Sequence, residues 1–384
     1  MKYSLTYGPK KRFFAFVLEC IGFFICKPLA ILSGRGKQNS PNILIIEPFQ
    51  MGDIIALSAI FGPLRKKYPL ARFYILGKKG PVQIARLLTD VEDILFADFP
   101  WSTKGNESGS WLLWFQQMRA FRRYGFSLGI DVRGDVRSHL SLILAGCRSI
   151  LSFRQYIYSD IQNHGLLADY QVNECRLQHV FDRNRLLLTG LGIPETELFP
   201  VSFPLFTLKE GGGRNQEMKT RPILLHVGAS WLYKMWPLAH WAGLIRQFQD
   251  EGIGPLIVVA GPGEEHIVQG IRNLLPKENM PEVRFPTLSE LIVLLQNASL
   301  LIGCDSGPMC IANALNIPRI ALFGPGIPEV WKPYSDSSVF LQDVSGYDCY
   351  PCILKECVRP DSPCIAQITT KYVSDHAKRI LGTV

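Results

Sequence analysis

The sequence predicts an α/β protein of two domains, each built on a parallel β-sheet with helices on both faces. Short apolar runs alternate with segments of helical periodicity, a pattern typical of doubly wound sheets. A polar, glycine-rich stretch at residues 209–221 (KEGGGRNQEMKTR) interrupts this alternation in mid-chain and is interpreted as a linker. The length of 384 residues and the hydrophobic content of 47% suit two domains of ordinary size.

The first domain is assigned to residues 41–208, where strands and helices begin to alternate. A strand at 42–47 (NILIIE) is followed by the loop PFQMGD and then by a segment of helical periodicity at 54–67. The next strands are expected at 72–76 and 127–132. This order of strand, helix and strand predicts a parallel sheet with ligands at the carboxyl ends of its strands.

The second domain is assigned to residues 222–384, where the alternation restarts. Its expected strands are 223–227, 255–260, 300–303 and 319–323. Its expected helices are 238–249, 264–275, 289–297, a short helix after Ser306, and 370–381.

Residues 1–40 form a separate amino-terminal segment with a basic and then an apolar part. Lys10 to Arg12 precede a run, FFAFVLECIGFFICKPLAILS, which Glu19 and Lys27 interrupt. The run is too short and too interrupted to favour a transmembrane span. We expect an interfacial helix on the cytoplasmic leaflet, and a helix packed on the protein itself is the alternative.

The chain carries 41 basic and 33 acidic residues, a formal net charge of +8. Such a surplus suits anionic small molecules and anionic lipids. The sequence has no long basic run and no nucleic-acid motif, so nucleic acid is not an expected partner. A cytoplasmic membrane surface is the favoured one.

The ten cysteines fall into two classes. Six are scattered among apolar neighbours, as reduced core cysteines are: Cys20, Cys26, Cys147, Cys175, Cys304 and Cys310. Four are clustered: Cys349, Cys352, Cys357 and Cys364. The cluster fits a structural zinc site, a pair of disulfides or reduced thiols, and in each case a structural role rather than a catalytic one.

The stretch from Asp305 to Pro325 (DSGPMCIANALNIPRIALFGP) lies between two apolar runs that read as core strands. Asp305 and Ser306 are favoured helix N-caps, and Gly307 allows close approach of the backbone. A helix that begins at the carboxyl end of a strand offers N–H groups and a positive dipole end to a phosphate. A capped crossover helix without a ligand is the alternative.

Four stretches, taken together and in order, carry a resemblance: 43–69 (ILIIEPFQMGDIIALSAIFGPLRKKYP), 224–245 (LLHVGASWLYKMWPLAHWAGLI), 258–266 (VVAGPGEEH) and 304–325. They resemble glycosyltransferase family 9, the lipopolysaccharide heptosyltransferases. The cysteine cluster resembles a segment that many members carry. The resemblance implies the GT-B fold, in which two Rossmann-like domains face each other across a cleft. It also implies that the first domain binds the acceptor and the second the nucleotide-sugar donor.

The resemblance implies that Asp53, which closes the loop MGD, is the catalytic general base. A carboxylate there would take the proton from the acceptor hydroxyl while the anomeric carbon loses its diphosphate. The structural alternative is that Asp53 only caps a helix that starts at Ile54.

The resemblance places donor binding in the second domain. Lys234 of KMWP would neutralise charge on the leaving diphosphate, and Ser230 ends a small-residue turn suited to anions. Glu264, or its neighbour Glu265, matches the acid near the donor ribose. The matched phosphate motif is Asp305, Ser306, Gly307, Pro308 and Met309. Cys310 stands where the family usually has His, so the resemblance implies no role for this side chain in donor binding and does not specify the donor sugar. Anion binding by the backbone N–H groups of the helix start does not depend on it.

Arg133 and Arg137 follow the strand that ends at Val132. They would meet carboxylates or phosphates of an acidic acceptor sugar, and surface arginines without a ligand are the alternative.

We therefore expect an inverting heptosyltransferase that uses ADP-heptose, requires no cofactor, acts on the lipopolysaccharide core and lipid A acceptor, and is cytoplasmic and peripheral to the inner membrane. A nucleotide-sugar epimerase of GT-B fold is one alternative, and it would isomerise the donor alone. A non-catalytic protein that binds lipopolysaccharide precursors is the other, although Asp53, Lys234 and the DSG turn argue against it.

Overall fold

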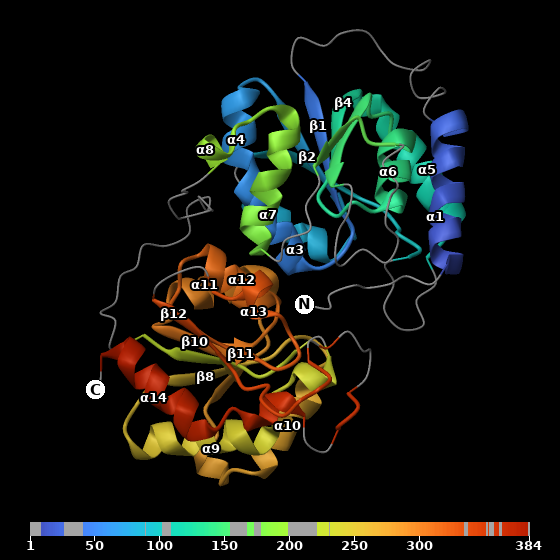
Figure 1. Cartoon of the computed structure of the whole chain (residues 1–384). Coiled ribbons are helices and arrows are strands. Elements are labelled where there is room, and N and C mark those ends of the chain that lie inside the picture. The colour runs from blue at the N-terminus through green and yellow to red at the C-terminus, as the bar shows by residue number, and fades with distance from the viewer. Residues whose placement is uncertain are drawn as a thin grey trace. The chain divides into compact units, whose positions relative to one another are not determined.

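The computed structural model of the chain describes residues 9–26, 41–88, 90–101, 109–153, 167–172, 178–198, 221–229, 231–333, 337–350, 352, 357–360 and 363–382. The chain divides into two compact units, unit 1 (Met1–Ser202) and unit 2 (Phe203–Val384) (Figure 1). The predicted linker at 209–221 lies outside the described residues except for Arg221.

Unit 1 contains a parallel sheet of six strands in the order β3-β2-β1-β4-β5-β6. The central strand β1 is buried at every position of NILIIE, because helices cover both faces of the sheet. Its Leu44 pairs with Tyr74 of β2 and Gly129 of β4. The strands are β1 (Asn42–Glu47), β2 (Arg72–Gly77), β3 (Val91–Phe96), β4 (Phe126–Asp131), β5 (Ser149–Phe153) and β6 (Tyr170–Val172).

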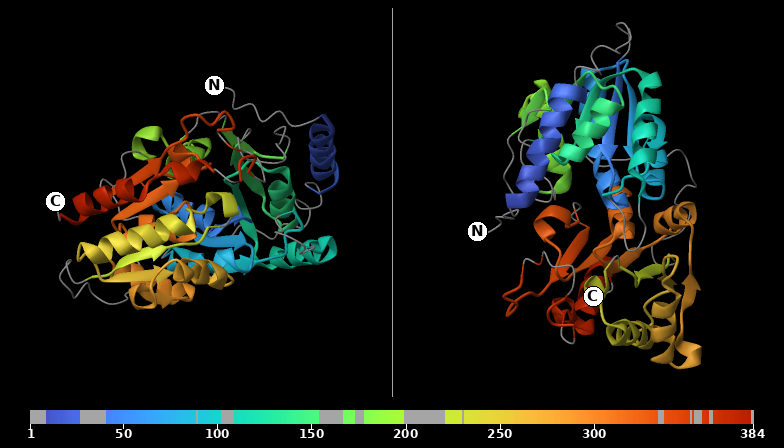
Figure 2. Two further views of the ribbon diagram at one scale, coloured as in Figure 1. Left: turned by 90° about the horizontal axis from the view of Figure 1, so that it is seen from below. Right: turned by 90° about the vertical axis from the view of Figure 1, so that its right-hand side faces the viewer.

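Helices cover the two faces of this sheet in two groups (Figures 1 and 2). One group contains α3 (Met51–Ala56), α4 (Ser58–Lys67) and α7 (Val180–Leu186), with α8 (Glu195–Leu198) next to α7. The other contains α1 (Pro9–Ile21) with the short π-helix η1 (Gly22–Cys26), α5 (Trp111–Phe121) and α6 (Val136–Leu144).

The helix expected at 54–67 begins three residues earlier than predicted and is divided in two. It starts at Met51, and Leu57 separates α3 from α4. Asp53 therefore lies in the first turn of α3 rather than in the position before a helix. Its Oδ2 accepts a hydrogen bond of 3.2 Å from the backbone N–H of Gln50.

Unit 2 contains a second parallel sheet of six strands, in the order β12-β11-β10-β7-β8-β9. The strands are β7 (Ile223–His226), β8 (Leu256–Val259), β9 (Glu282–Arg284), β10 (Leu300–Cys304), β11 (Arg319–Phe323) and β12 (Ser338–Gln342). The helices are α9 (Leu238–Asp250), α10 (Glu265–Asn273), α11 (Leu288–Gln296), α12 (Gly307–Ala314), α13 (Pro328–Trp331) and α14 (Thr370–Leu381).

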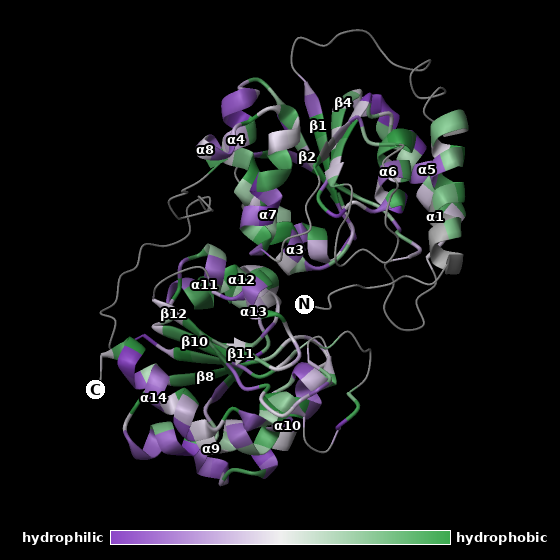
Figure 3. Ribbon diagram, viewed as in Figure 1, coloured by the Kyte–Doolittle hydropathy of each residue, from purple (hydrophilic) through white to green (hydrophobic). Residues whose placement is uncertain are grey.

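The core of unit 2 lies between the sheet and the helices α9, α10 and α14, and α11 and α12 cover the other face (Figure 1). Trp236 and Trp241 are fully buried in this core. The Trp236 indole donates a hydrogen bond of 2.8 Å to the carbonyl of Ile368, which ties the start of α9 to the segment before α14. Colouring by hydropathy shows the apolar strands enclosed by helices with polar outer faces (Figure 3).

The two sheets have the same strand order when each is counted within its own unit, and it is the order of dinucleotide-binding folds. The prediction of two Rossmann-like domains with parallel sheets is confirmed. In each sheet the order reverses between two neighbouring strands, β1 and β4 in unit 1, and β7 and β10 in unit 2. Ligands of such sheets bind beyond the carboxyl ends of these strands.

Candidate functional site

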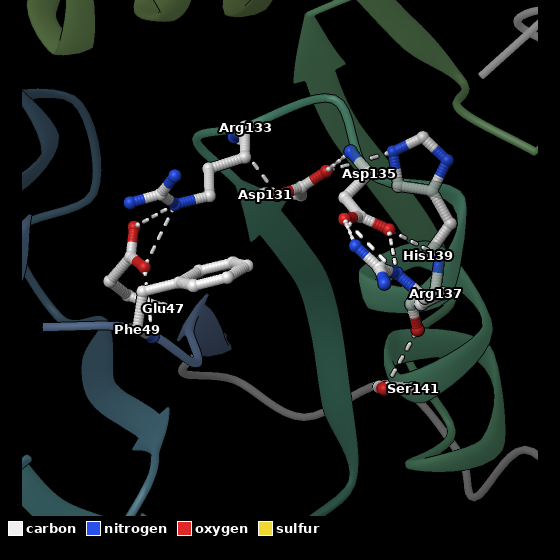
Figure 4. Close-up of polar contacts among 8 residues, drawn as sticks. All are labelled: Glu47, Phe49, Asp131, Arg133, Asp135, Arg137, His139 and Ser141. Carbon is white, nitrogen blue, oxygen red and sulfur yellow. Dashed lines mark hydrogen bonds and ion pairs between the residues drawn. The ribbon is translucent and has the colours of Figure 1, made fainter. Parts of the chain in front are cut away.

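In unit 1, three charged side chains meet where the strand order reverses. Glu47 ends β1, Asp53 lies in α3, and Arg133 follows β4. The Nε of Arg133 is 3.0 Å from both carboxylate oxygens of Glu47, and its guanidinium is 2.7 Å from Oδ1 of Asp53. Figure 4 shows the contact between Arg133 and Glu47. Arg133 therefore connects the predicted base to the end of the central strand.

The side chains of this cluster are largely buried. Glu47 is 1% exposed, and the guanidinium of Arg133 lies 4.1 Å from the ring centroid of Phe49. Burial raises the pKa of Glu47 to about 8, against the opposing effect of Arg133, with the Asp53 carboxylate adding to the rise.

Asp131, fully buried at the end of β4, organises the loop that carries the two arginines. Its carboxylate accepts backbone hydrogen bonds from Arg133 at 3.0 Å and Asp135 at 2.8 Å. It also contacts the Nε2 of His139 and the hydroxyl of Ser152, each at 3.1 Å. Because the carboxylate ties the loop to α6 and to β5, the position of Arg133 is fixed by the strand end.

Arg137, predicted to bind the acceptor, is 7% exposed and pairs with Asp135, with 2.9 Å between its Nε and Oδ1 (Figure 4). It also lies 5.5 Å from the ring centroid of Trp101. Both predicted acceptor-binding arginines are therefore engaged with carboxylates of the protein itself. Acceptor binding by either stays a prediction.

In unit 2, Lys234 and Asp305 form an ion pair with 2.6 Å between Nζ and Oδ2. Lys234 ends the short 3₁₀ turn η6 (Leu232–Lys234) after β7, and Asp305 directly follows β10. The pair therefore lies at the strand-order reversal of the second sheet. Burial works to lower the pKa of Lys234, but the Asp305 carboxylate outweighs it and the pKa is raised. The raised pKa favours the protonated, positively charged form of Lys234.

The first turn of α12 lies beside this pair, and Ser306 precedes it without a side-chain cap. The hydroxyl of Ser306 instead lies 3.4 Å from Nδ1 of His226, whose pKa burial lowers to about 4. Gly307 is the first helical residue, followed by Pro308, which has no N–H. The side chain of Met309 is buried, so its backbone N–H is the group it offers. These residues present an uncapped helix start.

Glu264 fills the space between the loops after β7 and β8. Its Oε2 accepts a 2.6 Å hydrogen bond from the backbone N–H of Gly261. A Cβ on Gly228 would lie 2.0 Å from both carboxylate oxygens of Glu264, so a larger residue at that position would require the Glu264 side chain to move. Glu265, the alternative acid, is exposed and begins α10.

Ser230, also predicted to bind the donor, lies outside the described residues. Cys310, at the position where the family usually has His, lies half-buried in α12 as a reduced cysteine. It is close enough to Lys234 and Arg319 to influence the pKa of each.

The four clustered cysteines are half-buried and carry free thiols in the structure. Burial raises the pKa of Cys364 to about 11, and the other three thiols of the cluster add to the rise. Within the described ranges, no group of three or more His, Cys, Asp or Glu side chains is arranged to hold a metal ion.

Sequence reasoning did not identify Glu47, Asp131 or His226. Each is a polar residue at or near the carboxyl end of a buried strand, and each is itself buried. That position was the available signal, because a polar side chain at the end of an apolar strand in a parallel sheet faces the ligand-binding edge.

The model of glycosyltransferase family 9 (heptosyltransferase) matches residues 114–361. Lipopolysaccharide heptosyltransferase 2 of Escherichia coli K12 is 23% identical over 329 residues, which cover 79% of this chain and 89% of that protein.

Two solved structures share the fold at low identity. That of E. coli ADP-heptose lipopolysaccharide heptosyltransferase II superposes with a TM-score of 0.69 at 18% identity, covering 89% of this chain and 99% of that one. That of E. coli heptosyltransferase WaaC with ADP-2-deoxy-2-fluoro heptose superposes with a TM-score of 0.63 at 17% identity, covering 88% and 99%. The predicted GT-B class is confirmed.

Proposed function

Because this chain belongs to glycosyltransferase family 9, the heptosyltransferases, we propose that it transfers a heptose from ADP-heptose to the inner core of lipopolysaccharide, with inversion at the anomeric carbon. Family membership makes the chain a glycosyltransferase. The epimerase and the non-catalytic binding protein are therefore both less favoured than a glycosyltransferase. The choice of heptose and ADP is supported by the names of the relatives above.

The main support for donor binding in unit 2 is the Lys234–Asp305 pair beside the uncapped start of α12, at the strand-order reversal of the sheet. A diphosphate requires positive charge and N–H donors, and this position supplies both. Asp305 holds the ammonium group in place. Ser306, Gly307, Pro308 and Met309 form the helix start. Glu264 lies near the same loops, where its carboxylate would accept hydrogen bonds from ribose hydroxyls.

In the proposed reaction, Asp53 takes the proton from the acceptor hydroxyl, whose oxygen then attacks the anomeric carbon from the face opposite the diphosphate. The bond from the anomeric carbon to the diphosphate oxygen breaks, and ADP leaves with the electron pair. Lys234 and the N–H groups of α12 stabilise the added charge on ADP, so no metal cofactor is required in this scheme. A single displacement inverts the anomeric configuration.

Arg133 and Arg137 are proposed to contribute to acceptor binding at the edge of unit 1. In Arg133 the support is its position beside Asp53, since a group that orients the base also lies near the acceptor. We further propose that the enzyme works in the cytoplasm, peripheral to the inner membrane, where its lipid-linked acceptor is available.

The deciding experiment is Asp53→Ala assayed with ADP-heptose and an inner-core acceptor. Loss of a general base lowers the rate by about a hundredfold or more, while binding of ADP-heptose in a calorimetric titration should remain close to wild type. Asp93→Ala, which removes an exposed carboxylate of the same unit, is the matched control. Turnover by Asp53→Ala at the wild-type rate would show that the base is another group. Conversion of ADP-heptose without acceptor would favour epimerase chemistry.

A further inference from the structure

Unit 1 exposes an unusual number of large apolar side chains on α1, η1 and the first half of α5. We name them the aromatic surface: Phe13, Phe16, Phe23 and Phe24 of α1 and η1, and Trp111, Leu112, Leu113 and Phe115 of α5. Phe24 is 72% exposed and Leu112 67%. Single exposed apolar residues are ordinary, but a group of this kind marks an interaction site.

The two parts of the aromatic surface lie on the same side of unit 1. Both α1 and α5 pack against α6, which is buried at every position and separates them (Figure 2, right). In α5 the inward residues are Trp114, Met118 and Phe121, and in α1 Leu18 packs against the same core. The exposed residues of each helix are therefore those that α6 does not cover.

The helix α1 is fixed to unit 1 by its inner face. Glu19 is fully buried, and a Cβ on Gly22 would lie 2.8 Å from Leu140 and 2.9 Å from Leu167. The two expectations for this segment, a helix packed on the protein and a helix with an apolar face outward, are thus both features of one element. Figure 3 shows α1 as mostly hydrophobic at the edge of unit 1.

The charged residues in the sequence of these helices indicate the kind of partner. Residues 9–26 and 111–124 contain six basic residues, Lys10, Lys11, Arg12, Arg119, Arg122 and Arg123. Their one acidic residue is Glu19, which is buried. Aromatic side chains with flanking Lys and Arg are the composition of helices that lie in the interface of an anionic bilayer. A protein partner would not require this absence of acidic groups.

The depth of the contact is limited by the length of the helices. None of the helices in the described part of the chain is long and apolar enough to cross a membrane. The 13 residues of α1 span about 20 Å at 1.5 Å per residue, less than a hydrocarbon core. The geometry therefore fits a helix lying in the plane of the headgroups.

We propose that the aromatic surface docks unit 1 onto a bilayer that contains anionic phospholipid, with Phe13, Phe16, Phe23 and Phe24 and the exposed residues at the start of α5 inserted among the headgroups. The inference deepens the proposed function, on which it rests in one respect: a lipid-linked acceptor requires the enzyme at the membrane. The α5 contribution could not be anticipated from the amino-terminal segment.

The test is sedimentation of the full-length protein with vesicles of phosphatidylcholine alone or mixed with phosphatidylglycerol. We expect binding to the mixed vesicles that added salt weakens. The double substitution Phe13→Ser with Phe16→Ser, and separately Leu112→Ser, should each lower the partition coefficient by about tenfold. Leu70→Ser removes a leucine that is 71% exposed elsewhere in unit 1 and should bind as wild type.

For each variant, two controls are measured: thermal unfolding, and heptose transfer to a delipidated, soluble core acceptor. Both should be unchanged, since the substituted side chains are exposed and belong to no proposed catalytic group. Wild-type protein that ignores anionic vesicles, or aromatic-surface variants that bind them undiminished, would overturn the proposal. So would a wild-type dimer that the substitutions convert to monomer. Absence of wild-type turnover with the soluble acceptor and with lipopolysaccharide alike, alongside normal vesicle binding, would instead count against the proposed function.

Discussion

Arg133 shows how a single residue acquires its role from its surroundings. It bridges Glu47, with Nε at 3.0 Å, and Asp53, at 2.7 Å, while its guanidinium stacks on Phe49. A planar guanidinium with several fixed donors is suited to holding two carboxylates at once, which a lysine could not do in the same geometry. We infer that Arg133 orients Asp53 in addition to any contact with the acceptor.

The raised pKa of Glu47 predicts how the stability of the protein depends on pH. Its pKa is about 8 in the folded protein and 4.5 ordinarily, so between these values the folded state holds a proton that the unfolded state has lost. The contribution of Glu47 to the free energy of unfolding is therefore complete below pH 4.5 and is lost as the pH rises through 8. We expect the free energy of unfolding of the wild type to fall relative to Glu47→Gln by roughly 1–3 kcal/mol between about pH 5.5 and 7.5.

Urea unfolding of both proteins across this pH range measures the difference. Glu92→Gln, an exposed glutamate of the same unit, is the control and should follow the wild-type profile. A constant difference between wild type and Glu47→Gln would mean that Glu47 stays ionised throughout, paired with Arg133.

At the scale of the element, the loops after parallel strands form the site because neighbouring strands end at the same edge. The loop after β7 carries Gly228 and Lys234, and the loop after β10 carries Asp305. Their positions depend on close packing: a Cβ on Gly326, in the loop after β11, would lie 3.0 Å from Oδ2 of Asp305. The loops leave little room for larger residues.

Gly228 and Glu264 allow this packing to be measured. Gly228→Ala should destabilise the protein by about 1–3 kcal/mol, because its Cβ would overlap the Glu264 carboxylate. In a Glu264→Ala background the same change should cost little, since the obstruction is gone. Urea unfolding of the four proteins completes the cycle. Gly62→Ala, at an open position in α4, should be neutral or slightly stabilising. An equal cost in both backgrounds would contradict the packing.

At the scale of the whole molecule, one strand order occurs twice, so the chain has two sheet edges of the kind at which α/β proteins bind ligands. A transferase with two substrates makes use of such a design, because donor and acceptor differ in chemistry and require separate sites. The charged groups differ accordingly. A carboxylate with an arginine stands at the edge of unit 1, and a lysine with an uncapped helix start stands at that of unit 2.

The nucleotide is tested on the intact protein by thermal shift with ADP, UDP, GDP and CMP. ADP should raise the unfolding temperature most, because it is the nucleotide of the proposed donor. A ligand present at a hundred times its Kd adds about 2.7 kcal/mol to the free energy of unfolding. Lys234→Met should lose most of this shift, and Asp53→Ala should keep it. Stabilisation by UDP with none by ADP would rule out an ADP-sugar donor.

The sequence by itself determined the central strands and the helices of unit 2 other than α13, because hydrophobic period and turn residues act within a few positions of the chain. It missed the strands toward the sheet edges, β3, β5, β6, β9 and β12, which are shorter or carry polar residues; β9, for example, reads EVR. Four of them, β3, β6, β9 and β12, are outermost strands with one neighbour, so their hydrophobic pattern is weak; β5 (SILSF) lies between β4 and β6 but is short and begins with a polar residue.

Only the tertiary structure decided which side chains meet. Glu47 and Arg133 are 86 residues apart in sequence, and Lys234 and Asp305 are 71 apart. These pairs form because the strand order of each sheet brings β1 beside β4 and β7 beside β10, and their carboxyl ends then share an edge. The apolar segments at α1 and α5 likewise lie on the same side of unit 1 because both pack on α6. Contacts of this kind depend on topology, which no local pattern encodes.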